Sequence, residues 1–165
     1  MRAFIVAIAL VGLLSVSSAQ SLRSQVETAD KAIAAAIKKK DFSKLSMLMR
    51  SVTTDDFKYT EAGKSQSYAE MTANMKTGLG MMGKITVCTV RLLTLHQHGS
   101  TADGTTRHTM AGIVKTNDKK VHKMSFTGVS ANTYRLEGHK WKLVSMKWVS
   151  QKQSMDGKPV PSMGG

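Results

Sequence analysis

One stretch of this chain decides its fold: Asn132-Thr133-Tyr134-Arg135-Leu136-Glu137-Gly138-His139-Lys140-Trp141-Lys142-Leu143-Val144. The Glu-Gly pair at 137–138 separates two runs that are rich in aromatic and branched side chains. This pattern is typical of a tight turn between two strands. We therefore predict strands over residues 120–136 and 139–151, and the short connection makes them antiparallel.

Two more long strands precede this hairpin, over residues 85–98 and 105–116, with a short extra strand at 57–60. Turn residues at 99–104 and 117–118 keep their connections short, which predicts an antiparallel meander. Each long strand has apolar residues on both phases, which indicates a sheet covered by helices on one face and by a partner on the other. We therefore expect a homodimer. In the last strand we expect Val144, Met146 and Trp148 to face the interior, with Trp148 buried.

Three helices come first along the chain. Ser24 and Glu27 have the spacing of a capping box, and apolar residues then recur at helical spacing up to the lysines at 38–40. A second, shorter amphipathic helix follows over residues 42–52. Ser67 and Glu70 form another capping box, which predicts the start of a third helix.

Four stretches contain local sequence motifs that are similar to those of a known superfamily: residues 29–41, 52–57, 59–64 and 132–144. In this order they resemble the nuclear transport factor 2-like superfamily, and within it the secreted bacterial SnoaL-like branch. The resemblance covers residues 26–151. It implies an α+β cone-shaped fold, in which three N-terminal helices pack in a strongly curved antiparallel β-sheet around an apolar cavity. Members include isomerases, dehydratases, cyclases and binding modules, so the fold alone does not identify a function.

The catalytic residues of the resembling enzymes do not carry over to this chain. The ketosteroid isomerase branch places an Asp base three positions before the glycine of the first hairpin, and that position is Thr60 here. The cyclases use an acidic residue late in the sheet, whereas residues 140–151 contain no Asp or Glu. The resemblance therefore implies no catalytic residue, and whether the protein is an enzyme stays open.

The N-terminal segment has the features of an export signal. Arg2 precedes an almost wholly apolar run, and Ser17-x-Ala19 supplies the small residues that a signal peptidase accepts. We predict a signal peptide over residues 1–19, a SnoaL-like domain over 20–152 and a disordered tail over 153–165. The protein would then be secreted or periplasmic, with no integral membrane span after cleavage; the alternative is a retained N-terminal anchor.

Composition limits the other classes of function. The chain has 165 residues, a net charge of +13 and one cysteine, so an intrachain disulfide is excluded. Cys88 lies in a β-branched run and is best interpreted as a small buried hydrophobe. Aromatic residues make up only 5%, which argues against stacking on nucleic acid. His96 and His98 have no third ligand nearby in sequence, so we expect no metal and no cofactor.

Two residues could bring polar groups into the cavity of a cone. Tyr59 and His108 alternate with apolar neighbours on different strands, so both inward faces would converge. We predict a ligand-binding cavity formed by Tyr59, His108, Met110 and Trp148, for a small apolar or carbonyl-bearing ligand. The leading hypothesis is an exported small-molecule-binding module without catalysis. The alternatives are an isomerase, dehydratase or hydrolase that uses Tyr59 and His108, and a basic adaptor for anionic envelope surfaces.

Overall fold

The computed structural model describes residues 21–116 and 120–160, which form three helices and seven strands. The signal peptide predicted over residues 1–19 lies outside this range. The helices are α1 (Leu22–Lys39), α2 (Phe42–Val52) and α3 (Tyr68–Met81). The strands are β1 (Thr53–Glu61), β2 (Lys64–Ser67), β3 (Met82–His98), β4 (Thr101–Lys115), β5 (Val121–Glu137), β6 (Lys140–Met155) and β7 (Lys158–Val160).

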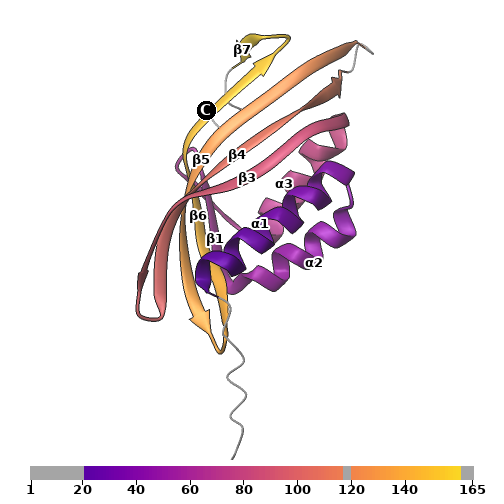
Figure 1. The fold of residues 1–165 in the computed structure, drawn as a ribbon. Coiled ribbons are helices and arrows are strands. Elements are labelled where there is room, and N and C mark those ends of the chain that lie inside the picture. Colours follow the sequence, from indigo (N-terminus) through magenta and orange to yellow (C-terminus); the bar gives the residue numbers. More distant parts are fainter. Residues whose placement is uncertain (1–20, 117–119, 161–165) are drawn as a thin grey trace, which may run out of the picture.

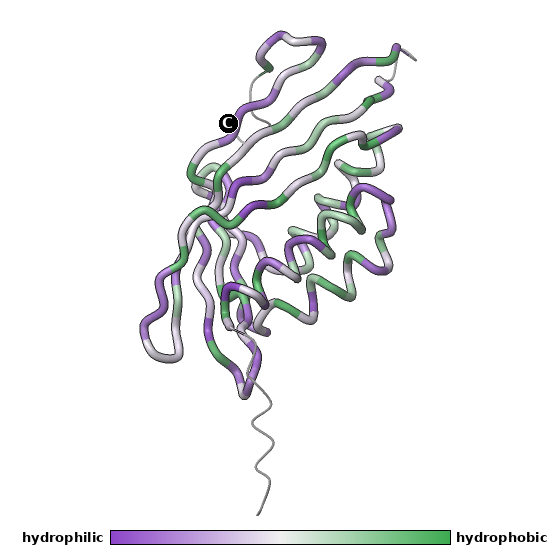
Figure 2. Tube along the Cα trace, in the orientation of Figure 1, coloured by the Kyte–Doolittle hydropathy of each residue, from purple (hydrophilic) through white to green (hydrophobic). Residues whose placement is uncertain are grey.

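The strands form one strongly bent sheet whose concave face holds the three helices (Figure 1). The strand order is β2-β1-β6-β5-β4-β3, and β7 pairs with β6. The expected α+β cone is confirmed, with one difference. The sheet is mixed rather than antiparallel, because β1 pairs with β6 in parallel while the other neighbours are antiparallel. In Figure 2 the turn between β5 and β6 is hydrophilic, whereas the tip of the β3–β4 hairpin is nearly white.

The start of α1 differs from the predicted one. Ser21 is the N-cap, and its side chain accepts a hydrogen bond from the Ser24 amide at 3.3 Å. The capping box predicted at Ser24 is therefore wrong, because Ser24 already lies in the first turn and Glu27 pairs with Arg23 instead, at 3.2 Å. The capping box predicted at Ser67 is confirmed, since both of its reciprocal hydrogen bonds with Glu70 are present.

The apolar core has two parts, both on the concave face. The main cluster lies between the helices and the sheet and consists of Ala36, Leu45, Met49, Phe57, Met71, Leu79, Met82 and Ile85. A second cluster packs the first half of α1 against the sheet and consists of Leu22, Val26, Leu92, Ala102 and Tyr134. Leu143 packs against both clusters, so the two parts are continuous.

Irregular pairing in β6 changes the expected face of that strand. The register with β5 passes from Tyr134↔Leu143 to Thr133↔Ser145, which leaves Val144 as an extra residue. As a result Leu143 packs against the core together with Met146, although the two lie on opposite phases of a regular strand. Val144, which we expected to face the interior, belongs to neither core cluster. Trp148 is half-buried rather than buried.

The disordered tail predicted over residues 153–165 is wrong for residues 153–160. β6 continues to Met155, and a two-residue turn at Asp156 and Gly157 leads into β7. Both turn residues have positive φ, 52° and 78°, which Asp-Gly turns favour. The Asp156 carboxylate also accepts from the Lys123 amide at 2.8 Å and contacts His122 Nδ1 at 2.7 Å. Residues 161–165 of the predicted tail lie outside the described range.

Candidate functional site

Three of the four residues predicted to line a cavity lie in direct contact. The indole Nε1 of Trp148 donates to the Tyr59 hydroxyl at 2.6 Å. The Trp148 ring meets the His108 ring edge to face, with centroids 4.8 Å apart. Met110 lies two residues beyond His108 on β4 and packs against the main core cluster. The structure therefore brings Tyr59, His108 and Trp148 together, with Met110 beside them on the same strand face.

A glycine makes room for this cluster. His108 on β4 faces Gly128 on β5, next to the pair Ser130↔Trp148. A Cβ atom at position 128 would lie 2.6 Å from the Trp148 ring and 2.9 Å from the Ser150 carbonyl oxygen. Such distances are far inside ordinary contact, so a side chain at 128 would displace the indole. Phe126 also packs edge to face against the Trp148 ring, at 5.3 Å between centroids.

Hydrogen bonds extend the cluster along the sheet in both directions. The Tyr59 hydroxyl donates to Glu61 Oε2 at 3.0 Å, and the Gln151 amide donates to Glu61 Oε1 at 2.6 Å. On the other side His108 Nε2 and Ser130 Oγ lie 2.9 Å apart. We call these six residues, Glu61, Tyr59, Gln151, Trp148, His108 and Ser130, the tyrosine–histidine network.

Burial sets the charge of the two titratable rings in the network. It lowers the pKa of His108 to about 4, because no nearby acid compensates the cost of charging the imidazole. Burial, followed by the neighbouring Glu61 charge, raises the pKa of the Tyr59 phenol. At neutral pH both rings are therefore uncharged. They act as hydrogen-bonding groups, and the imidazole can serve as a base but is not protonated in advance.

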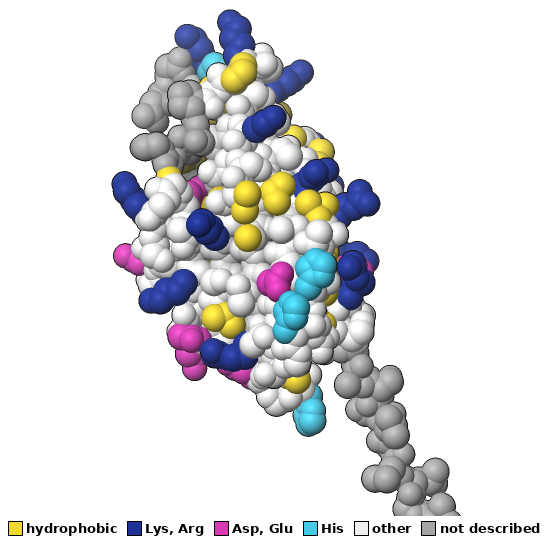
Figure 3. Space-filling model, turned by 90° about the vertical axis from the view of Figure 1, so that its left-hand side faces the viewer, with side chains coloured by type: hydrophobic (Ala, Val, Ile, Leu, Met, Phe, Trp, Pro, Cys, Tyr) yellow, Lys and Arg dark blue, Asp and Glu magenta, His cyan; other side chains and the backbone are white. Residues whose placement is uncertain are grey.

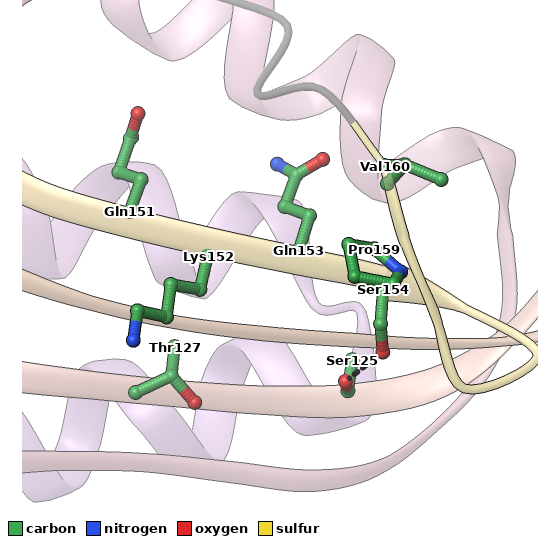
Figure 4. Close-up of a pocket in the computed structure, with 8 residues that line it drawn as sticks. All are labelled: Ser125, Thr127, Gln151, Lys152, Gln153, Ser154, Pro159 and Val160. Carbon is green, nitrogen blue, oxygen red and sulfur yellow. Dashed lines mark hydrogen bonds between the residues drawn. The ribbon is translucent and has the colours of Figure 1, made fainter.

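An open depression of about 610 Å³ lies at one end of this network. Its walls come from β5, β6 and β7, as Figure 4 shows. The lining residues are Ser125, Thr127, Gln151, Lys152, Gln153, Ser154, Pro159 and Val160. None of the four predicted cavity residues lines it. Gln151 belongs to both, because its side chain lines the depression while its amide binds Glu61.

A second polar group lies on the concave face, where α1 covers the sheet. Asn132 donates to Thr106 Oγ at 2.9 Å and to the Tyr134 hydroxyl at 3.3 Å. Asn132 Oδ1 and Asp30 Oδ2 are both buried without a hydrogen-bond partner. Burial, and then the charge of Glu27, raises the pKa of Asp30 to about 6. Burial and the Asp30 charge raise the pKa of Tyr134 to about 12, so Asp30 and Tyr134 interact.

Sequence reasoning missed two carboxylates of this interior. Glu61 lies two residues after Tyr59 on β1, and the alternation of a strand puts both on one face. Asp30 lies four residues after Val26 and three before Ile33, inside the apolar stripe of α1. An acidic residue in such a stripe is the signal that could have identified it. Thr60, by contrast, contacts Ser65 at 3.4 Å, on the opposite phase of β1 from Tyr59 and Glu61.

Two further expectations concern the described residues. Cys88 packs against the main core cluster, and burial raises its pKa, as befits an unreactive thiol. His98 contacts the Asp103 carboxylate at 3.2 Å, and within residues 21–116 and 120–160 no group of three or more metal-binding side chains forms. In the same part of the chain no helix is both long and apolar enough to cross a membrane.

Comparison with known proteins finds likeness in structure alone. No family model matches the chain, and no curated protein does. A hexachlorocyclohexane dehydrochlorinase is similar with a TM-score of 0.60 and 14% identity, covering 87% of this chain and 91% of that one. A nuclear transport factor 2-like protein from Salmonella enterica has a TM-score of 0.57 and 14% identity, covering 84% and 92%.

The Kfla4162 protein from Kribbella flavida has a TM-score of 0.60 and 14% identity, covering 78% of this chain and 91% of its own. At such low identities the matches indicate the fold, and the roles of individual residues have to be argued from the site itself. The architecture, a layer of helices inside a bent sheet, is in agreement with the fold of these matches. This chain has the nuclear transport factor 2-like fold.

Proposed function

We propose that this protein is an exported module that binds a small molecule at the tyrosine–histidine network. The observation that carries the proposal is the unbroken series of contacts from an open depression to the half-buried imidazole of His108. Gln151 lines the depression and binds Glu61, Glu61 binds Tyr59, and Tyr59 accepts from Trp148. A ligand that displaces the Gln151 amide would therefore reach the residues predicted to hold it.

The chemistry of the network defines the ligand class. Aromatic rings of Trp148 and Phe126 and the side chain of Met110 offer an apolar surface. His108 uses Nε2 for Ser130, which leaves Nδ1 with no partner among the described residues. A neutral imidazole with one free nitrogen can pair with a carbonyl or hydroxyl group. The ligand is therefore small and largely apolar, with one such polar group. Export and a homodimer are parts of the same proposal.

The first prediction concerns co-purification of this ligand. Protein isolated from its own envelope fraction should begin at Gln20 and should carry a small molecule in native mass spectrometry. Tyr59→Phe and His108→Ala should each weaken its retention about 10- to 100-fold, the usual effect of one lost buried hydrogen bond. The mass of the intact species also gives the oligomeric state.

Matched controls separate binding from folding in this experiment. Tyr68→Phe removes a phenol that donates to the Ser46 carbonyl on the helical side, and His139→Ala removes an exposed imidazole. Both should retain the molecule. Retention that is unchanged in Tyr59→Phe and His108→Ala would reduce the network to a structural role. An intact Met1 on the mature protein would contradict export.

A second candidate function, acid–base catalysis, is favoured by Asp30. A buried carboxyl with a pKa of about 6 is half ionised at that pH and mostly ionised at neutral pH, which suits a general base. Its unpaired Oδ2 has no hydrogen-bond donor, and the protonated Tyr134 phenol is close enough to feel its charge. The fold is compatible with catalysis, since a hexachlorocyclohexane dehydrochlorinase has a similar fold. The reaction class would be proton abstraction next to a carbonyl.

Catalysed proton exchange tests this candidate without knowledge of the natural substrate. Cyclohexanone in D₂O should exchange the hydrogens next to its carbonyl faster with the protein than without it, and the rate should rise with pH around 6. Asp30→Asn should lower the catalysed rate by about 10²- to 10⁴-fold, the usual contribution of a positioned base. Glu61→Gln, which changes the other missed carboxylate, should keep the rate. An equal loss in both variants would exclude Asp30 as the base.

A further inference from the structure

Two arginines stand directly opposite each other on the convex face of the sheet. Arg91 on β3 and Arg107 on β4 are partners in the strand register, and both are exposed. Residues so paired have Cβ atoms about 5 Å apart, and like charges in this position destabilise a sheet. Neither guanidinium has an acidic partner within residues 21–116 and 120–160. The pair therefore lacks a counter-charge.

The neighbouring rows of the sheet add cations and hydroxyl groups. One adjacent row runs Thr89, Thr109, Thr127 and Lys152 across four strands. The other row runs Thr94, Thr105, Ala131 and Lys147, and the two threonine hydroxyls lie 2.8 Å apart. We call Arg91, Arg107, Lys147 and Lys152, with the threonines between them, the arginine patch. The acid of this face nearest to the arginine pair in register, Asp103, lies two rows away and contacts His98 at 3.2 Å.

Figure 3 shows this face, on which Lys and Arg side chains outnumber acidic ones. We propose that the arginine patch binds a linear polyanion, an anionic polysaccharide whose sulfate or carboxylate groups supply the missing counter-charge. Guanidinium groups pair with such oxyanions through two parallel N–H bonds, and threonine hydroxyls donate further bonds. Thr127 and Lys152 of the patch also line the open depression, whereas Arg91 and Arg107 do not. The inference rests on the arginine pair and does not depend on the ligand proposed for the tyrosine–histidine network.

Shape and side-chain chemistry favour a polysaccharide over other polyanions. The face is convex in the view of Figure 1, so a flat lipid surface would touch only a narrow line of it, whereas a flexible chain can follow the bend. The aromatic residues of the described strands belong to the concave side, in the two core clusters or around Trp148. Bases of single-stranded nucleic acid would therefore find no stacking partner. A homodimer that met through this patch would bring like charges together, so we place the arginine patch outside the interface of the homodimer proposed above.

Binding to heparin, a densely sulfated polysaccharide, tests the inference. The wild-type protein should bind heparin and not neutral dextran, with an affinity that falls steeply with salt. The double variant Arg91→Gln/Arg107→Gln should bind about 10- to 100-fold more weakly at 0.1 M salt. Its slope of log Kd against log salt should be smaller by about 2, one for each cation removed. Its thermal midpoint should not fall, because a repulsive pair has been removed.

The control variant removes the same charge from the helical side. Lys44→Gln/Lys76→Gln changes two exposed lysines of α2 and α3 and should bind heparin almost like the wild type. An equal loss in both double variants would show a general effect of net charge and overturn the patch. So would binding to phosphatidylglycerol vesicles or to oligo-dT that is as tight as binding to heparin. Stronger self-association of Arg91→Gln/Arg107→Gln would assign the face to a second copy instead.

Discussion

Asp30→Asn is expected to make the protein more stable at pH 8 by about 3 kcal/mol. The pKa of Asp30 is raised from 3.8 to about 6 by burial, so the folded state resists ionisation of this carboxyl. A shift of this size corresponds to about 3 kcal/mol at 1.36 kcal/mol for each pKa unit. Below pH 3.8 both states are protonated and the carboxyl costs nothing. As pH rises to about 6 the unfolded state ionises first, and stability falls.

Urea unfolding between pH 4 and pH 8 measures this effect. The difference between Asp30→Asn and the wild type should be small at pH 4, should grow up to about pH 6 and should then stay constant. Asp103→Asn changes an exposed carboxylate and serves as the control, with little expected change in stability. A variant that is equally stable or less stable than the wild type at pH 8 would mean that Asp30 has a compensating donor.

The stabilising effect of His108→Gln is expected at low pH, whereas that of Asp30→Asn is expected at high pH. Burial lowers the pKa of His108 from 6.5 to about 4, so the unfolded state takes up a proton that the folded state refuses. Stability therefore falls as pH drops from 6.5 towards 4, by about 3 kcal/mol in total. His108→Gln has no such proton and should lose less stability on acidification. Its side-chain amide can still pair with Ser130, which limits the change at pH 8.

The two groups oppose each other in nearly the same pH range. In the wild type the gain from protonated Asp30 and the loss from His108 should almost cancel between pH 4 and 6.5. Asp30→Asn alone should then become less stable on acidification, and His108→Gln alone should become more stable. The double variant should again vary little from these two sources. Parallel curves for all four proteins would show that neither group is held away from water.

Local patterns were sufficient for most elements of the fold. Ser67 and Glu70 start α3, and the Glu-Gly pair at 137–138 turns β5 into β6, because caps and tight turns depend on neighbours in sequence. The same kind of signal at Asp156-Gly157 was available, but the surrounding Met, Pro, Ser and Lys favoured disorder. The hairpin that ends in β7 forms because Asp156 contacts His122 and Lys123 on β5, distant in sequence.

At the candidate site, too, sequence patterns identified some residues and only tertiary contacts identified the others. Alternation along single strands placed Tyr59 and His108 on inward faces, and the structure brings both to Trp148. It did not identify Glu61 or Asp30 as partners, because their roles come from contacts across 90 residues with Gln151 and from the burial of α1 against Tyr134.

The amino-acid order by itself determined three helices, a meander of long strands and an inward face that carries Tyr59 and His108. These features follow from side-chain periodicity, which each segment holds alone. Only the tertiary structure decided that β1 runs parallel to β6, that bulges at Val144 and Val149 set the facing of β6, and that Arg91 meets Arg107. Strand register arises from the joint packing of all strands and helices, and a shift of one residue exchanges the two faces. No single segment contains that information.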